Sequence, residues 1–281
     1  MINEFIYTIN NFAFMQRALI AAILVGIISG AIGVFIILRG LSLMGDAISH
    51  AVIPGVAISH MLGINFMIGA SFFGILTSFT IGFIAENSRL KKDTTIGIVF
   101  TSFFALGLVL ISRIRTVTDL NSILFGNVLT VTNYDIRNIF YIGILLFAFI
   151  IIFYKELLIT SFDEVLAKVY GIKTKLIHYM FLFVLTLVIV SSLRVVGAIM
   201  IVSMIITPAA TSYLLTNRLP IMIILSMCIG ALSSIIGMFF SVTFNLPAGS
   251  TIVLVLASFF LVAFLFSSIK KKGKIVKPKK F

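Results

Sequence analysis

Residues 40–63 read GLSLMGDAISHAVIPGVAISHMLG, an apolar stretch that contains one aspartate and two histidines. The stretch is long enough to cross a bilayer as a helix, because each helical residue rises ~1.5 Å and the hydrocarbon core is ~30 Å thick. Asp46 is the only acidic residue that the chain places within a predicted membrane span. An ionisable side chain at membrane depth is costly, so Asp46 indicates a substrate or ion pathway.

Asp46 and His50 are four residues apart, so on a helix their side chains point in nearly the same direction, ~40° apart. A carboxylate with an imidazole one turn away is the beginning of a site for a transition-metal cation. On an unbroken helix His60 would lie ~320° around from Asp46 and ~21 Å along the axis, near the outer mouth. For His60 a metal-relay role and a plain interfacial position both remain open.

Two proline positions interrupt the predicted spans, Pro54–Gly55 and Thr207–Pro208. Irregular backbone at membrane depth is tolerated where it is buried in protein or lines a cavity. We therefore predict broken helices that bend at a gate, with a simple packing kink as the alternative for each.

The composition identifies an integral membrane protein. Of 281 residues, 60% are hydrophobic and only 11% are charged, and the mean hydropathy is +1.23. Soluble domains average about 25% charged residues. The apolar runs are continuous over about 20 residues, whereas barrel strands alternate over about 10. The predicted class is all-α, a polytopic helical bundle.

Nine apolar spans predict a single transmembrane domain over residues 1–281. The count falls to eight if one segment is re-entrant. The predicted spans are 13–38, 41–62, 64–85, 95–112, 137–154, 176–193, 195–216, 220–243 and 250–268.

The distribution of basic residues predicts the orientation. With the N-terminus outside, 16 Lys and Arg residues lie in cytoplasmic segments and five lie outside. Seven of them belong to the tail at 269–281, which is typical of a cytoplasmic face against anionic lipid. The net charge of +12 is therefore no sign of nucleic-acid binding.

Two connecting segments carry further predictions. Within the cytoplasmic loop 155–175, FDEVLAKVYG predicts a short helix with Asp163 and Glu164 in its first turn and Gly171 at its end. Such a helix is either a docking surface or an ordinary connector. The segment 113–135 is too apolar for a free loop and predicts a re-entrant or interfacial helix on the outer side.

Small residues in the first and eighth spans, such as Gly26, Gly30 and Gly230, predict close helix packing. The single cysteine, Cys228, lies in an apolar run and is interpreted as a small buried residue.

Six stretches in order resemble the integral-membrane permease of ABC-type importers for manganese, zinc and iron, most closely the manganese branch. The strongest is GLSLMGDAISHAVIPGVAI at 40–58. The others are TTIGIVFTSFFALGLVLIS at 94–112, DLNSILFGNVL at 119–129, YKELLITSFDEVLAKVYGI at 154–172, VVGAIMIVSMIITPAATSYLL at 195–215 and LPAGSTIVLVLASFFLVAFLF at 246–266.

This resemblance implies a fold like that of type II ABC importers and a homodimer with the metal pathway on its two-fold axis. It implies cytoplasmic ATPase subunits, an extracellular metal-binding protein as a partner, and a plasma-membrane location. It places Asp46 and His50 on the pathway. The segment SFDEVLAKVYGI, with Asp163, Glu164, Ala167 and Gly171, matches the coupling helix. The likeness assigns nothing to His60.

The chain should be a non-catalytic subunit, because it has no GxxxxGK[ST] phosphate loop and no HExxH motif. No permanent cofactor is expected, and the transported ion is manganese, with zinc and iron as alternatives. Ser122, where a histidine would also fit, weakens the choice of manganese. A proton-coupled secondary cation transporter centred on Asp46 is the competing hypothesis, and it would need no ATPase.

Overall fold

The computed structural model describes residues 2–113 and 130–275, in which helices are joined by short connections and no strand occurs. The helices are α1 (Ile2–Asn11), α2 (Ala13–Leu38), α3 (Ser42–Ala51), α4 (Ile53–Leu62), α5 (Phe66–Asn87), α6 (Lys92–Arg113), α8 (Asn133–Ile152), α9 (Tyr154–Phe162), α10 (Glu164–Val169), α11 (Thr174–Val196), α12 (Ala198–Leu215), α13 (Leu219–Phe244) and α14 (Ala248–Ile275).

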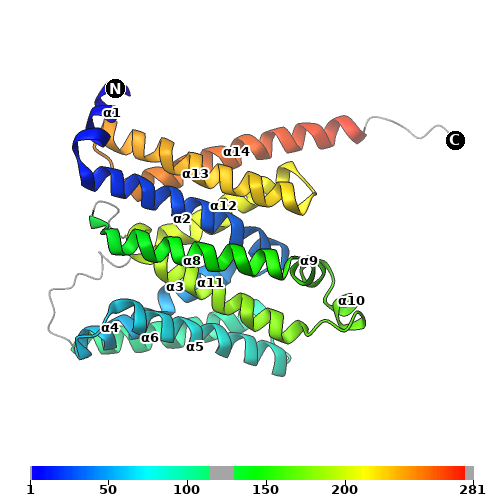
Figure 1. The fold of residues 1–281 in the computed structure, drawn as a ribbon. Helices are drawn as coiled ribbons and strands as arrows, with labels where there is room; N and C mark the ends of the chain where they lie inside the picture. Colours follow the sequence, from blue (N-terminus) through cyan, green and yellow to red (C-terminus); the bar gives the residue numbers. More distant parts are fainter. Residues whose placement is uncertain (1, 114–129, 276–281) are drawn as a thin grey trace.

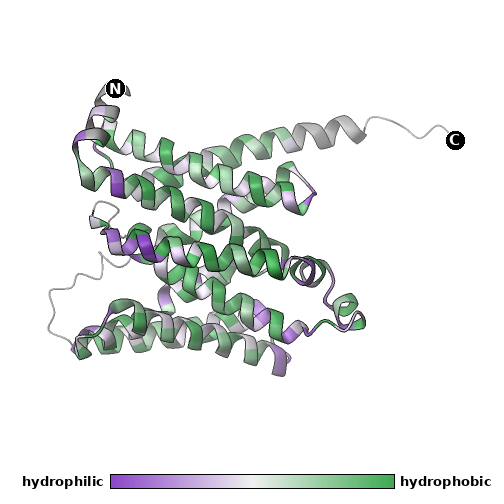
Figure 2. Cartoon of the chain, in the orientation of Figure 1, coloured by the Kyte–Doolittle hydropathy of each residue, from purple (hydrophilic) through white to green (hydrophobic). Residues whose placement is uncertain are grey.

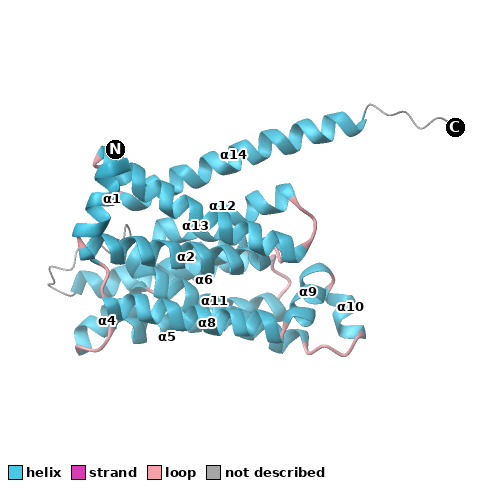
Figure 3. Cartoon of the chain, turned by 45° about the horizontal axis from the view of Figure 1, so that its top comes forward, coloured by secondary structure: helices cyan, strands magenta, loops and turns pink. Residues whose placement is uncertain are grey.

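The long helices lie roughly side by side in two groups (Figures 1 and 3). In one group α2, α12, α13 and α14 pack against one another, and in the other α4, α5 and α6 do so. α8 and α11 lie between the groups, and α3 contacts α12 as well as α5 and α6. The short helix α3, which carries Asp46 and His50, therefore lies where the two groups meet.

Within the described residues, seven helices are long and apolar enough to cross a membrane: α2, α5, α6, α8, α11, α13 and α14. Hydrophobic residues predominate along the coloured parts of these helices, and hydrophilic residues gather toward their ends (Figure 2). The predicted all-α membrane class is therefore confirmed. The two other predicted spans correspond to shorter elements, because 41–62 is divided into α3 and α4, and 195–216 is the shorter helix α12.

The division between α3 and α4 follows from Pro54. This residue lies in the first turn of α4, where its missing N–H leaves no helical bond unmade. In a regular helix that N–H would have bonded the carbonyl of His50, so the interruption falls at the candidate metal ligand. Gly55 packs backbone to backbone against Gly69 of α5, and a Cβ on either residue would collide with the other helix.

α12 continues through Pro208 without ending, unlike the broken helix expected at that position. A proline in a helix removes one backbone bond and bends the helix, but the remaining bonds preserve it. A role for Pro208 in gating stays a prediction.

Close packing of α2 against α13 explains the small residues of the first and eighth spans. A Cβ on Gly26 would lie 2.5 Å from the carbonyl oxygen of Gly230. Ser226 donates a hydrogen bond to the carbonyl of Gly30, with an O···O distance of 2.7 Å. Cys228 does not share this interface: it is exposed, so its prediction as a buried residue is wrong. It lies on the outer face of an apolar helix, where lipid rather than protein can cover it.

The two ends of the described chain lie at opposite ends of the bundle (Figure 1). α9 and α10 protrude from the end at which α14 finishes. α14 extends to Ile275, beyond the predicted span 250–268, so helix covers the first half of the predicted tail 269–281. Residues 276–281 lie outside the described part.

Candidate functional site

Asp46 and His50 face each other on α3. The His50 Nε2 atom lies 3.4 Å from the Asp46 Oδ1 atom, one helical turn away. This separation exceeds the usual length of an N–H···O hydrogen bond, about 2.7–3.2 Å. The two side chains are thus close enough to bind one ion, but they are not held together by a strong hydrogen bond.

The imidazole of His50 is held in an aromatic setting. The rings of Phe100 and Phe104 on α6 lie with their centroids 5.9 Å and 5.7 Å from the His50 ring centroid. The His50 Nδ1 atom is buried and has no hydrogen-bond partner among the described residues. An orphaned buried nitrogen is unusual, and the cost of leaving it unpaired favours a function that uses the imidazole.

The carboxylate side of the pair is open. Asp46 retains 47% of its side-chain exposure, and Leu43, one turn earlier on the same helix face, is 50% exposed. Because α3 lies between the two groups of apolar helices, we expect this face to lie at membrane depth. A carboxylate at that depth requires a water-filled path or a second protein surface, since exposure to lipid would be costly.

His60 lies apart from this pair. It occupies the last turn of α4, where it is exposed, and the break at Val52 separates the two helices. The geometry expected for an unbroken helix therefore does not apply to it. In residues 2–113 and 130–275, no group of three or more His, Cys, Asp or Glu side chains is arranged to bind a metal. The metal roles of Asp46, His50 and His60 stay predictions.

The short helix expected in the 155–175 loop is α10. The Asp163 carboxylate accepts hydrogen bonds from the backbone N–H groups of Val165 and Leu166, both at 2.9 Å, and so caps its first turn. At the other end Gly171 adopts φ +74°, and the N–H of Ile172 bonds the carbonyl of Ala167 at 3.1 Å. A left-handed residue in this position ends a helix and favours glycine.

One face of α10 is apolar and exposed. Val165, Val169 and Tyr170 are at least 70% exposed, whereas Ala167 is completely buried on the opposite face. α10 protrudes from the end of the bundle, past the ends of α2, α8 and α11 (Figure 1). A cluster of apolar side chains on a protruding element is typical of a protein-docking surface.

A surface ion pair lies along the same helix. Lys168 Nζ is 3.0 Å from Glu164 Oε1, one turn away. This charge-assisted hydrogen bond lowers the pKa of Glu164 from its ordinary value of 4.5.

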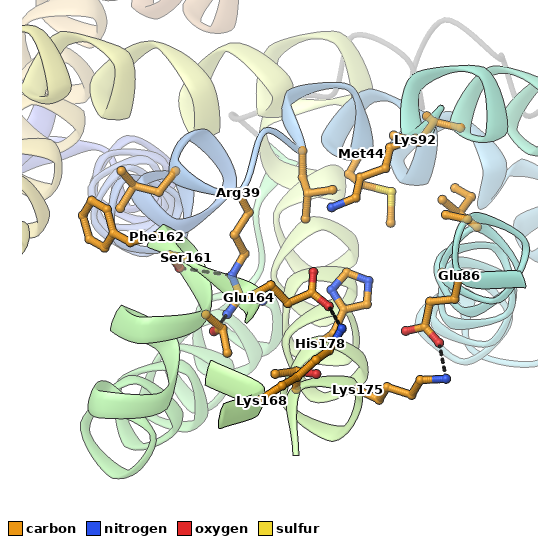
Figure 4. A pocket seen from close by; sticks show the side chains of 18 residues that line it. Arg39, Met44, Glu86, Lys92, Ser161, Phe162, Glu164, Lys168, Lys175 and His178 are labelled. Carbon is orange, nitrogen blue, oxygen red and sulfur yellow. Dashed lines mark hydrogen bonds and ion pairs between the residues drawn. The ribbon is translucent and has the colours of Figure 1, made fainter. Parts of the chain in front are cut away.

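A cavity of about 420 Å³ lies beside α10, at the same end of the bundle. Figure 4 shows side chains from α3, α5, α6, α10 and α11 around it, together with Arg39 from the turn after α2. Lys175 Nζ pairs with Glu86 Oε2 at 3.2 Å across one side. Burial of the guanidinium lowers the pKa of Arg39 to about 10. The sequence predicts no individual role for Arg39, because nothing in it shows what surrounds this side chain.

The predicted outer segment 113–135 is only partly described. Residues 114–129, and with them Ser122, lie outside the described part. Beyond them, Thr132 and Asp135 form a reciprocal cap at the start of α8, and Arg194 of α11 pairs with Asp135 at 3.1 Å.

Comparison with known proteins decides the family. The model of the ABC 3 transport family matches residues 11–267. The chain belongs to the ABC 3 transport family. The permease is 54% identical to the manganese transport system membrane protein MntC of Listeria innocua, over 98% of both chains. It is 53% identical to the manganese import system permease protein ScaB of Streptococcus gordonii, over 95% of this chain and 96% of that one.

A solved structure, PsaBC from Streptococcus pneumoniae in complex with Fab, has the same fold. It aligns with a TM-score of 0.85 and 53% identity, covering 94% of the permease and 95% of that chain. These findings confirm the predicted permease family and its manganese branch. They also confirm that the chain is a multi-pass membrane protein and the non-catalytic permease subunit of a transporter.

Proposed function

We propose that the permease forms the membrane pathway of an ATP-driven importer for manganese ions. Its similarity over nearly the whole chain to relatives named for manganese transport supports this choice of ion. The observation that carries the proposal is the half-exposed carboxylate of Asp46 beside His50, on a short helix between two groups of apolar helices. Zinc and iron are the alternative ions, because carboxylate, imidazole and water suit all three metals.

The spacing of the pair supports metal binding. Two ligand atoms 3.4 Å apart can both reach one ion through bonds of about 2.1 Å at an angle of about 110°. Bound in this way, the ion would replace the weak contact between the two side chains. Two protein ligands leave most of the coordination sphere to water or to another chain, so the ion would be held loosely enough to leave again.

A second copy of the chain would complete the site. The face of α3 that carries Leu43 and Asp46 is open at membrane depth, and a homodimer joined there would bring two aspartates and two histidines together. A self-complementary contact of this kind is what a two-fold axis requires. The metal pathway would then run along that axis.

The two ends of the bundle suit different partners. The apolar face of α10 is the proposed docking surface for a cytoplasmic ATPase, with Asp163 and Gly171 fixing the ends of the helix and Ala167 seating it on the bundle. The opposite end, where α4 finishes and α5 begins, would receive an extracellular metal-binding protein. In this proposed arrangement the N-terminus would lie outside the cell, and the basic tail would lie in the cytoplasm beneath the plasma membrane.

The kink between α3 and α4 is the proposed gate. Pro54 has no N–H to donate to the carbonyl of His50, so one helical bond is missing where α3 meets α4, and a tilt of α3 relative to α4 would occur there. Gly55, pressed against Gly69, would be the fixed point about which that tilt occurs.

The test is competitive uptake of manganese, zinc and iron by cells or vesicles that contain the permease, its ATPase and its metal-binding protein. Asp46→Asn preserves the size of the side chain and removes its charge, so we expect manganese uptake to be lost while the dimer persists. Asp93→Asn is the matched control, because it makes the same change at an exposed carboxylate in the first turn of α6.

Each outcome has a defined meaning. Normal uptake by Asp46→Asn would refute the assigned site. Preferred accumulation of zinc or iron would retain the site and overturn the choice of ion. Uptake that continues without the ATPase or without ATP would refute the importer mechanism and favour a secondary transporter.

A further inference from the structure

Arg39 connects three elements at the end of the bundle where α10 lies. Its Nη2 atom donates to the Thr160 hydroxyl of α9 at 2.8 Å, and its Nε atom donates to the Ser161 hydroxyl at 3.2 Å. Its guanidinium also lies over the ring of Phe181 on α11, with 4.6 Å between Cζ and the ring centroid. A planar guanidinium suits this combination of a forked pair of hydrogen bonds and aromatic stacking.

The backbone at Arg39 is fixed. Arg39 is the capping residue directly after α2, its N–H bonds the carbonyl of Phe35 at 3.0 Å, and Gly40 follows with φ +63°. The N–H of Leu41 then bonds the carbonyl of Ile36 at 3.0 Å, which closes the turn. Because α3 begins only three residues after Arg39, a displacement of this turn must also displace the start of α3.

The segment that Arg39 contacts leads directly to the proposed ATPase-docking helix. Thr160 and Ser161 are in the last turn of α9, and Asp163, which caps α10, follows two residues after Ser161. The cavity of about 420 Å³ separates α10 from much of α3, α5 and α6 (Figure 4). Arg39 therefore forms a direct polar connection between the α9–α10 segment and the turn that carries α3, alongside an open space.

We propose that Arg39 is a positioning residue that transmits movement of α9 and α10 to α3, and so couples ATP hydrolysis to metal release. The inference rests on the proposed function, because it takes α10 as the ATPase-docking helix and α3 as the metal-binding helix. Pulling Thr160 and Ser161 outward moves the guanidinium, and the rigid turn at Gly40 passes that movement to the base of α3. Asp46 lies in the second turn of that helix and His50 in its last turn.

The experiment measures manganese uptake and ATP hydrolysis in the same vesicles containing the complete importer. Two variants remove the hydrogen bonds between Arg39 and α9. Arg39→Ala removes the donors, and the double variant Thr160→Val, Ser161→Ala removes the acceptors and leaves Arg39 in place. The control is Lys175→Met, which removes the Glu86–Lys175 ion pair from the wall of the same cavity without touching α2 or α9. Arg39→Lys preserves the charge but cannot reproduce the fork.

We expect the number of ions transported per ATP hydrolysed to fall about tenfold or more in both disruptions, because small misplacements of a binding group reduce rates steeply. ATPase activity and complex assembly should be retained, and Arg39→Lys should show a smaller loss of coupling. An unchanged ratio in the double variant would overturn the proposal. A parallel loss of ATPase activity, uptake and assembly would also overturn it, because it would show a purely structural role.

Asp46→Asn in the same preparation separates the two hypotheses. Lost uptake in Asp46→Asn together with normal coupling in the Arg39 variants would refute this inference alone. Normal uptake in Asp46→Asn would instead refute the metal site on which the inference depends.

Discussion

The stability of α10 should depend on one side chain, Asp163. This helix has only six residues, far fewer than the about 12–15 that an isolated helix needs to be stable in water. The Asp163 carboxylate accepts hydrogen bonds from two backbone N–H groups in the first turn of α10, each at 2.9 Å. Replacing an N-terminal cap by alanine costs about 1 kcal/mol. That cost changes the folded fraction of a marginal helix by up to about fivefold.

We therefore expect Asp163→Ala to weaken the association of the ATPase with the permease by up to about fivefold. Asp163→Asn should bind almost normally, because asparagine caps helices as well as aspartate does. The assay is the affinity of the purified ATPase for the permease in lipid nanodiscs, with circular dichroism to confirm the overall fold. Equal affinities for the wild type and Asp163→Ala would refute the reasoning, and a loss in Asp163→Asn equal to that in Asp163→Ala would show that charge matters rather than capping.

Two further predictions concern packing and pH. Gly26→Ala would place a Cβ atom 2.5 Å from the carbonyl oxygen of Gly230, and overpacking of this kind costs about 1–3 kcal/mol. The melting temperature of this variant in detergent should therefore fall. Gly97→Ala is the control and should not destabilise the protein, because Gly97 has open space around it. The hydrogen bond from Lys168 lowers the pKa of Glu164 below 4.5. The ionised Glu164 therefore contributes to the stability of the fold above pH 4.5, and this contribution is lost as the pH falls through the lowered pKa. A titration of Glu164 by NMR should show its pKa returning toward 4.5 in Lys168→Met, and an unchanged value would contradict this cause.

Several elements could be predicted from local sequence. The apolar runs of the first, third and eighth spans predicted α2, α5 and α13 to within a few residues, because lipid requires a continuous apolar helix. The chain around Asp163 and Gly171 predicted α10, because capping and helix termination depend on neighbouring residues only. α9 was not predicted, since its residues read as the end of a span followed by a loop.

Other features depend on contacts between distant residues. The spacing of Asp46 and His50 follows from helix geometry, but the burial of the His50 Nδ1 atom depends on α6. The exposure of Cys228 depends on which face of α13 meets α2. No local sequence pattern indicates the contacts of Arg39, because its partners Thr160 and Ser161 lie more than 120 residues away in the chain.

The sequence by itself determined the membrane class, most of the helical spans, the Asp46–His50 pair and the ends of α10. Each of these depends on the polarity of a residue or on interactions within one or two helical turns. Only the tertiary structure decided which face of α3 stays open, where the cavity forms beside α10, and that Arg39 joins α2 to α9. These depend on how helices pack across long separations in sequence, where no local pattern indicates which side chains will meet.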